Sequence, residues 1–536
     1  MTVHSEPHTY LVVGAGPAGL QLGQHLQAAG HDYRILEGGA VPGAFFATFP
    51  RHRTLISNNK VHTGRSDPEF NLRMDWNSLL SDGPGEQDLR FTRYSREYFP
   101  KADDFCRYLA DYAAAFGLDI AYDTRVTRIR REGGADGEFV ATDQRGTEHR
   151  ARRLVMATGV SRPYLPPVPG IEDCELYPTV SVDPEDFIDQ RVLILGRGNS
   201  AFETADNLIP TAAVIHVAGP GSLKLAWRTH YVGHLRAVNN NFLDTYQLKS
   251  QNALLDGHVR SIEKRDGGYL VRFAFSRADE LVKELRYDRV IVCTGFRFDA
   301  SLFDEECRPE LVINDRFPAM TEAYESVNQP GLYFAGTLMQ QRDFKKSTSG
   351  FIHGYRYGVR ALSRILGLRH HERAWPHQEL KTDPQALTDA VIARVNRSSA
   401  LWQQFGVIGD LITHAPGGQV RYHEEVPVDY AHRGPLTREG TYYTITLEYG
   451  PEHDKVDPFD ITVRRIAQNS PGEAHDASYL HPVVRHFARG ELLGVHHLAE
   501  NLENEWDDPD VHEAPLTGFF AAAEERTARA GARADG

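Results

Sequence analysis

A glycine-rich turn near the start of the chain has the residue spacing that binds a dinucleotide pyrophosphate. The motif Gly14-Ala15-Gly16-Pro17-Ala18-Gly19 follows a short apolar strand at residues 10–13 and opens a helical apolar pattern at residues 20–29. In such a motif the first glycine permits a tight turn and the second lets the pyrophosphate approach the backbone. The third lets helix and strand pack closely. The unpaired amides at the helix start favour the phosphate charge.

An acidic residue completes this first motif. A strand at residues 33–36 ends at Glu37, about 20 residues beyond the first glycine, where a carboxylate binds a ribose hydroxyl. Strand, glycines, helix, strand and acid in this order predict a dinucleotide site, against the alternative of a turn that binds nothing. Gly38 and Val126 are included among the expected cofactor contacts.

A second motif of the same kind lies far along the chain. Gly196-Arg197-Gly198-Asn199-Ser200-Ala201 follows the apolar strand 191–195, and its alanine replaces the third glycine, which the motif allows. The next strand, 213–217, has no acid at its end, and Lys224 and Arg228 follow it. Cations there favour the 2′-phosphate of NADPH over NADH, although both side chains could simply be solvated.

Two such loops predict two dinucleotides, and FAD with NADPH (or NADH) is the economical pair. Two strand–Thr-Gly segments bracket the second loop, Ala157-Thr158-Gly159 and Thr294-Gly295. A later segment contains Gly336, and Gly350-Phe351-Ile352-His353 then opens a helix whose amides could face the flavin. Lys346 and His353 flank that helix. They could stabilise a reduced flavin, or be a surface cation and a core histidine.

Composition excludes several other classes. The chain has 536 residues, a net charge of -14 and no long apolar run, so we expect no nucleic acid partner and no membrane span. The 4 cysteines include no C-x-x-C pair, which argues against a dithiol centre, and the histidines lack metal-ligand spacing, so no metal is expected. The polar chain ends show no targeting signal, which predicts a cytoplasmic protein.

These motifs resemble the two-dinucleotide-binding-domain flavoproteins, in particular the flavin-containing monooxygenases. The resemblance implies an α/β fold with two Rossmann-like domains of the GR2 type, the NAD(P)H domain being inserted in the FAD domain. The expected divisions are an FAD domain in two parts, an NAD(P)H domain and a C-terminal α+β appendage. Their bounds are 1–159 and 296–370 for FAD, 160–295 for NAD(P)H and 371–536 for the appendage.

The resemblance also implies site residues. Asn59 is expected beside the flavin with Lys60 as an electrostatic neighbour, the alternative being an Asn-rich surface turn. Trp76 and Asn77 are expected to cap the flavin or line a pocket, the alternative being a core tryptophan with a helix-capping asparagine. A polar segment at 229–241 past the second loop could contact substrate or NADP, or be a loop between domains.

The implied activity is oxygenation of a small molecule, at nitrogen or another heteroatom, with dioxygen through a C4a-hydroperoxyflavin. The rivals are a flavin oxidase or reductase without oxygen insertion, and a non-catalytic, flavin-stabilised protein-binding module. No F-x-G-x-x-x-H-x-x-x-W segment precedes the second loop, which disfavours a ketone-to-ester reaction.

A closer resemblance extends over nearly the whole chain. The stretches 51–57, 71–80, 229–233 and 350–354 are similar to a family of eukaryotic endoplasmic-reticulum flavoproteins with an FAD-dependent oxidoreductase domain. Because we see no signal or retention sequence, a role in that compartment is not implied.

The C-terminal region carries no nucleotide motif. Alternation at 440–449 predicts a strand, and helical spacing predicts helices at 387–405 and 492–502. This region could cover the active site, form a homodimer surface or bind a carrier protein, and the sequence does not choose among them.

Overall fold

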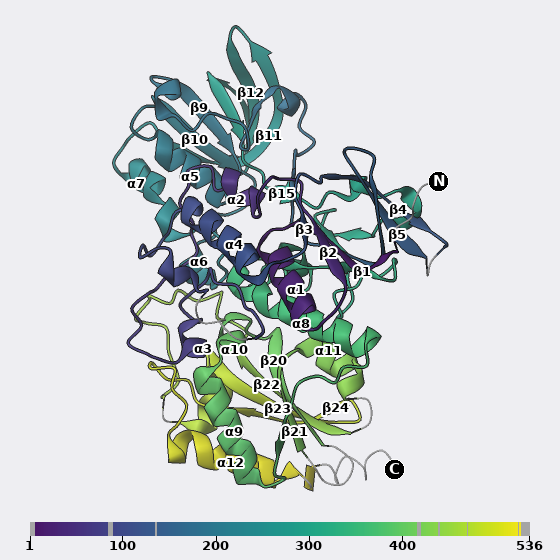
Figure 1. Ribbon diagram of the computed structural model, residues 1–536. Helices are drawn as coiled ribbons and strands as arrows, with labels where there is room; N and C mark the ends of the chain where they lie inside the picture. Colours follow the sequence, from purple (N-terminus) through teal and green to yellow (C-terminus); the bar gives the residue numbers. More distant parts are fainter. Residues whose placement is uncertain are drawn as a thin grey trace.

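The computed structural model describes residues 6–83, 89–134, 137–414, 420–437, 440–468, 470–523 and 525–526. The expectation that the chain ends carry no targeting signal falls largely on residues 1–5 and 527–536, which lie outside the described residues. Figure 1 shows three bodies in a row. The second unit, which contains the second glycine motif, is at the top. The first unit, which contains the first glycine motif, is in the middle, and the C-terminal region is below.

The first sheet has the strand order β3-β2-β1-β6-β5-β4, with β18 also pairing β6. Its strands are β1 (His8–Val13), β2 (Tyr33–Leu36), β3 (Ile120–Ala121), β4 (Val126–Glu132), β5 (Glu138–Asp143), β6 (Glu148–Met156) and β18 (Leu332–Phe334). The strands β3, β2, β1, β6 and β18 are parallel, and the end of β1 is buried on both faces, as parallel sheets require.

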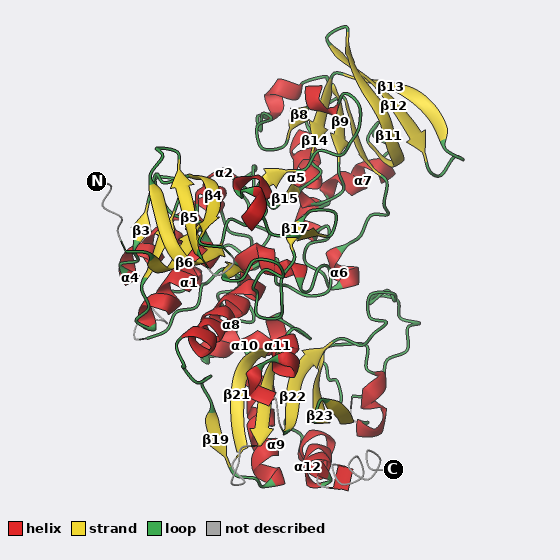
Figure 2. Cartoon of the chain, turned by 90° about the vertical axis from the view of Figure 1, so that its right-hand side faces the viewer, coloured by secondary structure: helices red, strands yellow, loops and turns green. Residues whose placement is uncertain are grey.

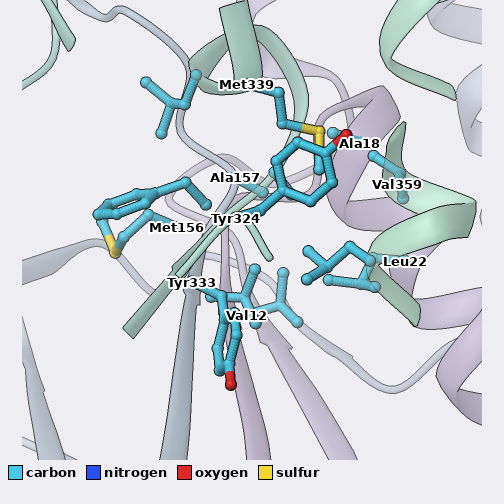
Figure 3. Close-up of a cluster of buried hydrophobic side chains, with 14 of the residues drawn as sticks. Val12, Ala18, Leu22, Met156, Ala157, Tyr324, Tyr333, Met339 and Val359 are labelled. Carbon is cyan, nitrogen blue, oxygen red and sulfur yellow. The ribbon is translucent and has the colours of Figure 1, made fainter. Parts of the chain in front are cut away.

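Two helices from opposite ends of the first unit pack together beside this sheet. They are α1 (Pro17–Ala28), which follows the first glycine loop, and α8 (Ile352–His370). Figure 3 shows the core between them and the sheet, where Val12, Leu22, Met339 and Val359 meet. A third helix, α4 (Ala102–Phe116), contacts α1 and buries the aromatic side chains of Phe105, Tyr108 and Tyr112.

The second sheet has the order β13-β12-β11-β10-β9-β14-β8. Its strands are β8 (Glu175–Leu176), β9 (Arg191–Leu195), β10 (Val214–Gly219), β11 (Ala253–Arg265), β12 (Gly268–Phe275), β13 (Leu281–Tyr287) and β14 (Arg289–Val292). The chain enters and leaves this unit through β7 (Arg162–Pro163) and β15 (Phe296–Arg297), which pair antiparallel. The predicted α/β fold is confirmed. The second sheet is formed by a segment that is inserted in the chain between β6 and β18 of the first sheet.

The C-terminal region is a six-stranded antiparallel sheet with the order β19-β21-β20-β22-β23-β24. Its elements are β19 (Gln378–Leu380), α9 (Pro384–Arg397), α10 (Ser399–Gln403), β20 (Ile408–His414), β21 (Val420–Pro427), α11 (Val428–Arg433), β22 (Thr441–Glu448), β23 (His481–Ala488), β24 (Glu491–His497) and α12 (Ala514–Ala521). One face packs against α9 and α12, while the other joins the core of the first unit (Figure 2).

One sequence-based expectation for this region was wrong, and another was confirmed with a break in the helix. The helix expected at 492–502 is the edge strand β24, because pairing with β23 outweighs an apolar spacing that fits either structure. The helix expected at 387–405 is broken at Ser398, which ends α9 and whose hydroxyl accepts from Leu401 N to cap α10.

Buried ion pairs join the C-terminal sheet to the first unit. Arg394 on α9 is 2% exposed, lies 2.7 Å from Asp410 Oδ2 and also pairs with Glu69 of the first unit. Arg360 on α8 pairs with Glu425 of β21, which is also buried. Within the described chain, no helix is both long and apolar enough to cross a bilayer.

Arg356 of α8 fixes the segment that carries Trp76. It is fully buried and donates to the carbonyls of Leu72, Asp75 and Ser78 at 2.7–2.9 Å. Three carbonyl acceptors replace the water that a buried guanidinium loses. The conformation of this segment is therefore dictated by a helix nearly 300 residues later in the chain.

Replacing Arg394 by Ala should lower the free energy of unfolding by about 3–5 kcal/mol, because Asp410 keeps a buried charge without its partner. Arg397→Ala is the matched control: Arg397 lies on the same helix but is 44% exposed, and its loss should cost about 1 kcal/mol or less. Denaturant unfolding of both variants checks this, and equal destabilisation would contradict it.

Candidate cofactor and active site

One cavity of about 470 Å³ lies between the first two units and receives residues from both glycine loops. A volume of this size is typical of cofactor and small-molecule sites. The sequence-predicted residues on its wall are Gly16, Pro17, Ala18, Trp76, Ala157, Thr158, Gly159, Asn199, Ser200, Gly336, Gly350, Phe351, Ile352 and His353. The structure thus brings together segments that are more than 300 residues apart in the chain.

The first glycine loop has the geometry of a pyrophosphate cradle. A Cβ on Gly14, whose φ is +105°, would lie 2.9 Å from Ala157 O, and one on Gly19 would lie 1.9 Å from Gly14 O. A Cβ on Gly16 would meet no protein atom within 4 Å, so the space above it is open. Glu37, buried at the end of β2, accepts from Ala15 N at 2.7 Å. These residues fit the adenosine diphosphate half of FAD.

The second loop repeats this arrangement at the start of α5 (Asn199–Leu208). A Cβ on Gly196 would lie 2.2 Å from Cys293 O, whereas Gly198 faces open space and Ala201 is fully buried. The loop therefore fits a second dinucleotide. Asn199 Oδ1 accepts from Arg236 N at 2.9 Å and so ties the loop to the 229–241 segment.

The cations expected to hold a 2′-phosphate are placed differently from the sequence expectation. Lys224 and Arg228 are exposed and do not line the cavity. Instead Arg197 lies against Gly219 at the end of β10 and pairs with Asp256. Asp256 stands beside Gly219 in the β10–β11 register. The acid missing from the end of β10 is therefore supplied by the neighbouring strand, which no reading along the chain would have linked to the motif.

An aromatic cluster forms the wall at the start of α8. The rings of Trp76 and His353 stack at 4.1 Å, and those of Phe351 and His353 lie nearly parallel at 5.9 Å. His353 is 2% exposed, and neither ring nitrogen has a hydrogen-bond partner in the described structure. Burial, followed by Arg356 and Arg236, holds its pKa well below the usual value, so the ring is neutral.

Asn59 and Lys60 do not reach the cavity. Asn59 is buried beside another segment and donates to the carbonyls of Ser95 and Glu97 at 2.8 and 3.1 Å. Lys60 is exposed. Asn77 lies one layer behind the wall, where its Oδ1 accepts from the hydroxyl of Ser57, a wall residue.

The remaining predicted residues lie around the cavity rather than on its wall. Lys346 is exposed, and Gly38 packs against Arg125 beside the buried start of β4 at Val126. Thr294 and Gly295 line a small pocket next to the main cavity, and the Thr294 hydroxyl donates to Tyr164 O.

Sequence reasoning missed a carboxyl group on the wall. Glu203 lies one turn after Asn199 on α5, and the hydroxyl of Tyr177 donates to it. Burial raises the pKa of Glu203 to about 7, although the Tyr177 hydrogen bond opposes this shift. The i, i+4 spacing from the motif was the available signal, because such residues share a helix face. Perturbed carboxyl groups in a cavity are typical of functional sites.

Gly16→Ala should leave the apoprotein as stable as the parent but weaken FAD binding at least about tenfold, since its Cβ meets only the space kept for the pyrophosphate. Flavin absorbance after FAD titration and thermal unfolding of the apoprotein check the two parts. Gly472→Ala, also free of neighbours but in the C-terminal region, should change neither. Unchanged FAD affinity in Gly16→Ala would refute the assignment of this loop.

Comparison with known proteins places the chain in a family. It matches the pyridine nucleotide-disulphide oxidoreductase family over residues 11–336. It is 39% identical to FAD-dependent oxidoreductase domain-containing protein 2 of Mus musculus, over 97% of this chain and 84% of that protein. This confirms the closer resemblance found in the sequence.

Solved structures share the fold at low identity. A flavin-containing monooxygenase from Stenotrophomonas maltophilia is 20% identical with a TM-score of 0.51, covering 68% of this chain and 99% of its own. The bacillithiol disulfide reductase of Staphylococcus aureus is 17% identical with a TM-score of 0.52, covering 68% of this chain and 100% of its own. The chain belongs to the pyridine nucleotide-disulphide oxidoreductase family and is an NAD(P)H-dependent flavoprotein oxidoreductase that uses FAD.

Proposed function

We propose that the protein is an NADPH-dependent monooxygenase that inserts one atom of dioxygen into a small molecule, with nitrogen or another heteroatom as the favoured target. The observation that carries this proposal is the single cavity shared by the two glycine loops. A cavity common to both loops lets a nicotinamide and a flavin meet in van der Waals contact, as hydride transfer requires. The likeness in fold to a flavin-containing monooxygenase is consistent with it.

When bound, FAD supplies the redox chemistry, accepting hydride from NAD(P)H and passing electrons to dioxygen. The chain itself supplies orientation and a dry site. The aromatic rings of Phe45, Phe46 and Phe49 line the cavity near the first loop. Such walls exclude water, which protects reactive species from hydrolysis. All four cysteines are free thiols and none lies on the cavity wall, so the described site offers no dithiol to a disulfide substrate.

The preference for NADPH over NADH is the finer part of this proposal. Arg197 stands at the end of β10, where the adenosine ribose lies in this fold. Its guanidinium could bind a 2′-phosphate, and Lys224 and Arg228 would add positive field from the surface. Asp256 opposes this preference by pairing with Arg197.

Glu203 should make reduction by NADPH depend on pH. Its carboxylate would stabilise the positive charge that develops on the nicotinamide as hydride leaves, and it ionises through a pKa of about 7. The anaerobic reduction rate should therefore rise by roughly tenfold as the pH increases through about 7. A tenfold change corresponds to about 1.4 kcal/mol in the activation free energy. Glu203→Gln should give a flat profile, as stopped-flow absorbance would show.

The raised pKa of Glu203 should also make the stability of the folded protein depend on pH. Unfolded Glu203 loses its proton above pH 4.5, while the folded side chain keeps it until about pH 7, so its contribution falls as pH rises between these values. The melting temperature of Glu203→Gln minus that of the parent should therefore be larger at pH 8 than at pH 5. A constant difference would show that the folded pKa is not raised.

The proposed activity is tested with the FAD-loaded protein in two stages. Anaerobic mixing with NADPH and with NADH should bleach the flavin, faster with NADPH. Reaction with ¹⁸O₂ should then place label in a product from a panel of primary amines and thioethers. Hydrogen peroxide equal to the dioxygen consumed for every compound would indicate an oxidase instead. No bleaching by either nucleotide would indicate a non-catalytic flavoprotein.

A further inference from the structure

Arg236 reaches across the boundary between the two dinucleotide units. It belongs to the 229–241 segment that follows the second loop, and its Nη2 donates to Asn58 Oδ1 of the first unit at 3.0 Å. Its guanidinium lies 5.3 Å from the ring centroid of Trp76. Arg236 is also the one arginine or lysine on the described cavity wall.

This guanidinium has an unbalanced charge. Among the described residues no carboxylate lies within ion-pair distance of it, and burial lowers its pKa without removing the charge. Two other arginines of the chain, Arg394 and Arg360, are paired with the carboxylates of Asp410 and Glu425. The Glu203 carboxyl group, also on the wall, accepts a hydrogen bond from Tyr177, and His353 is neutral.

A second polar side chain, that of His353, lies near the Arg236 guanidinium. Trp76 contacts both Arg236 and His353, and both of its neighbours border the cavity. The two ring nitrogens of His353 are buried, and no described protein group bonds them. An arginine guanidinium at the cavity wall is suited to binding a carboxylate or phosphate group.

We propose that Arg236 forms an oxyanion subsite in the cavity, and that it takes the carboxylate of the substrate. The inference rests on the proposed function and adds a substrate class to it: small organic acids whose oxidised atom lies near the flavin. A phosphate of the nicotinamide dinucleotide has the same chemistry. The carboxylate is favoured because Gly198 and the start of α5 already form a pyrophosphate site, while Arg236 faces the flavin-side residues Asn58 and Trp76.

The test uses the FAD-loaded protein and two probes of equal shape, benzoate and neutral benzamide. Benzoate should perturb the flavin absorbance saturably, benzamide should bind at least about tenfold more weakly, and Arg236→Gln should abolish this difference, consistent with the loss of one charge-assisted contact. Arg236→Lys should restore part of it. A parallel titration with NADP⁺ should show little change in affinity.

Asn58→Ala is the matched control, because it removes the contact between the two units and keeps the charge. It should still prefer benzoate, which separates anion binding from a loosened domain boundary. If Arg236→Gln weakens NADP⁺ and not benzoate, the oxyanion is the dinucleotide phosphate and the substrate class is overturned. If neither ligand is affected, the subsite itself is refuted. None of these readouts needs oxygen insertion, so failure of the monooxygenase proposal would appear separately in the labelling experiment.

Discussion

The meeting of two helix starts at one cavity is the constraint on which the rest of the structure depends. The glycine loops before α1 and α5 each leave open space above their second glycine, and both border the same cavity. Their relative position is fixed where the chain crosses between the units, at the β7–β15 pair. Around this crossing Tyr177 stacks on Phe49 at 5.7 Å, and Arg236 bonds Asn58. The contacts that close the cavity are thus also contacts between the two units.

The C-terminal region shapes the cavity without lining it, since no described residue beyond Tyr355 is on its wall. One face of its sheet shares a core with α8, and Arg394 and Arg360 carry ion pairs across the boundary. The Arg360 pair ties the middle of α8 to β21, on the same helix as His353. Removing this region would expose a continuous apolar core, so it is an integral part of the enzyme.

The same region also contacts the second unit. The ring of His230 lies 4.6 Å from Tyr449 and 5.3 Å from His453, and Trp227 lies 5.1 Å from Phe459. In Figure 2 the long loop of this region projects beside α6 (Ala226–Thr229). The segment that carries Arg236 is therefore held from three sides.

Motifs whose chemistry is local could be predicted from the sequence. The first glycine loop and Glu37 lie within one βαβ unit, so their spacing alone predicts their geometry. Contacts between residues that are distant in sequence could not be predicted. Arg236 belonged to no chemical motif, and the i, i+4 spacing of Glu203 from Asn199 did not by itself indicate a site. Asn59, chosen by resemblance, points to Ser95 and Glu97 instead of the cavity. The edge strand β24 was misassigned because its short apolar spacing fits two periods.

The sequence by itself determined the fold class, the two dinucleotide loops and the absence of a C-x-x-C dithiol, because each depends on residues close together in the chain. Only the tertiary structure decided which residues share the cavity, which acid stands at the end of β10, and which cation lies on the cavity wall. These properties arise from side chains such as Trp76, Arg236 and His353 that are distant in sequence. Their burial and partners exist only once the sheets have packed.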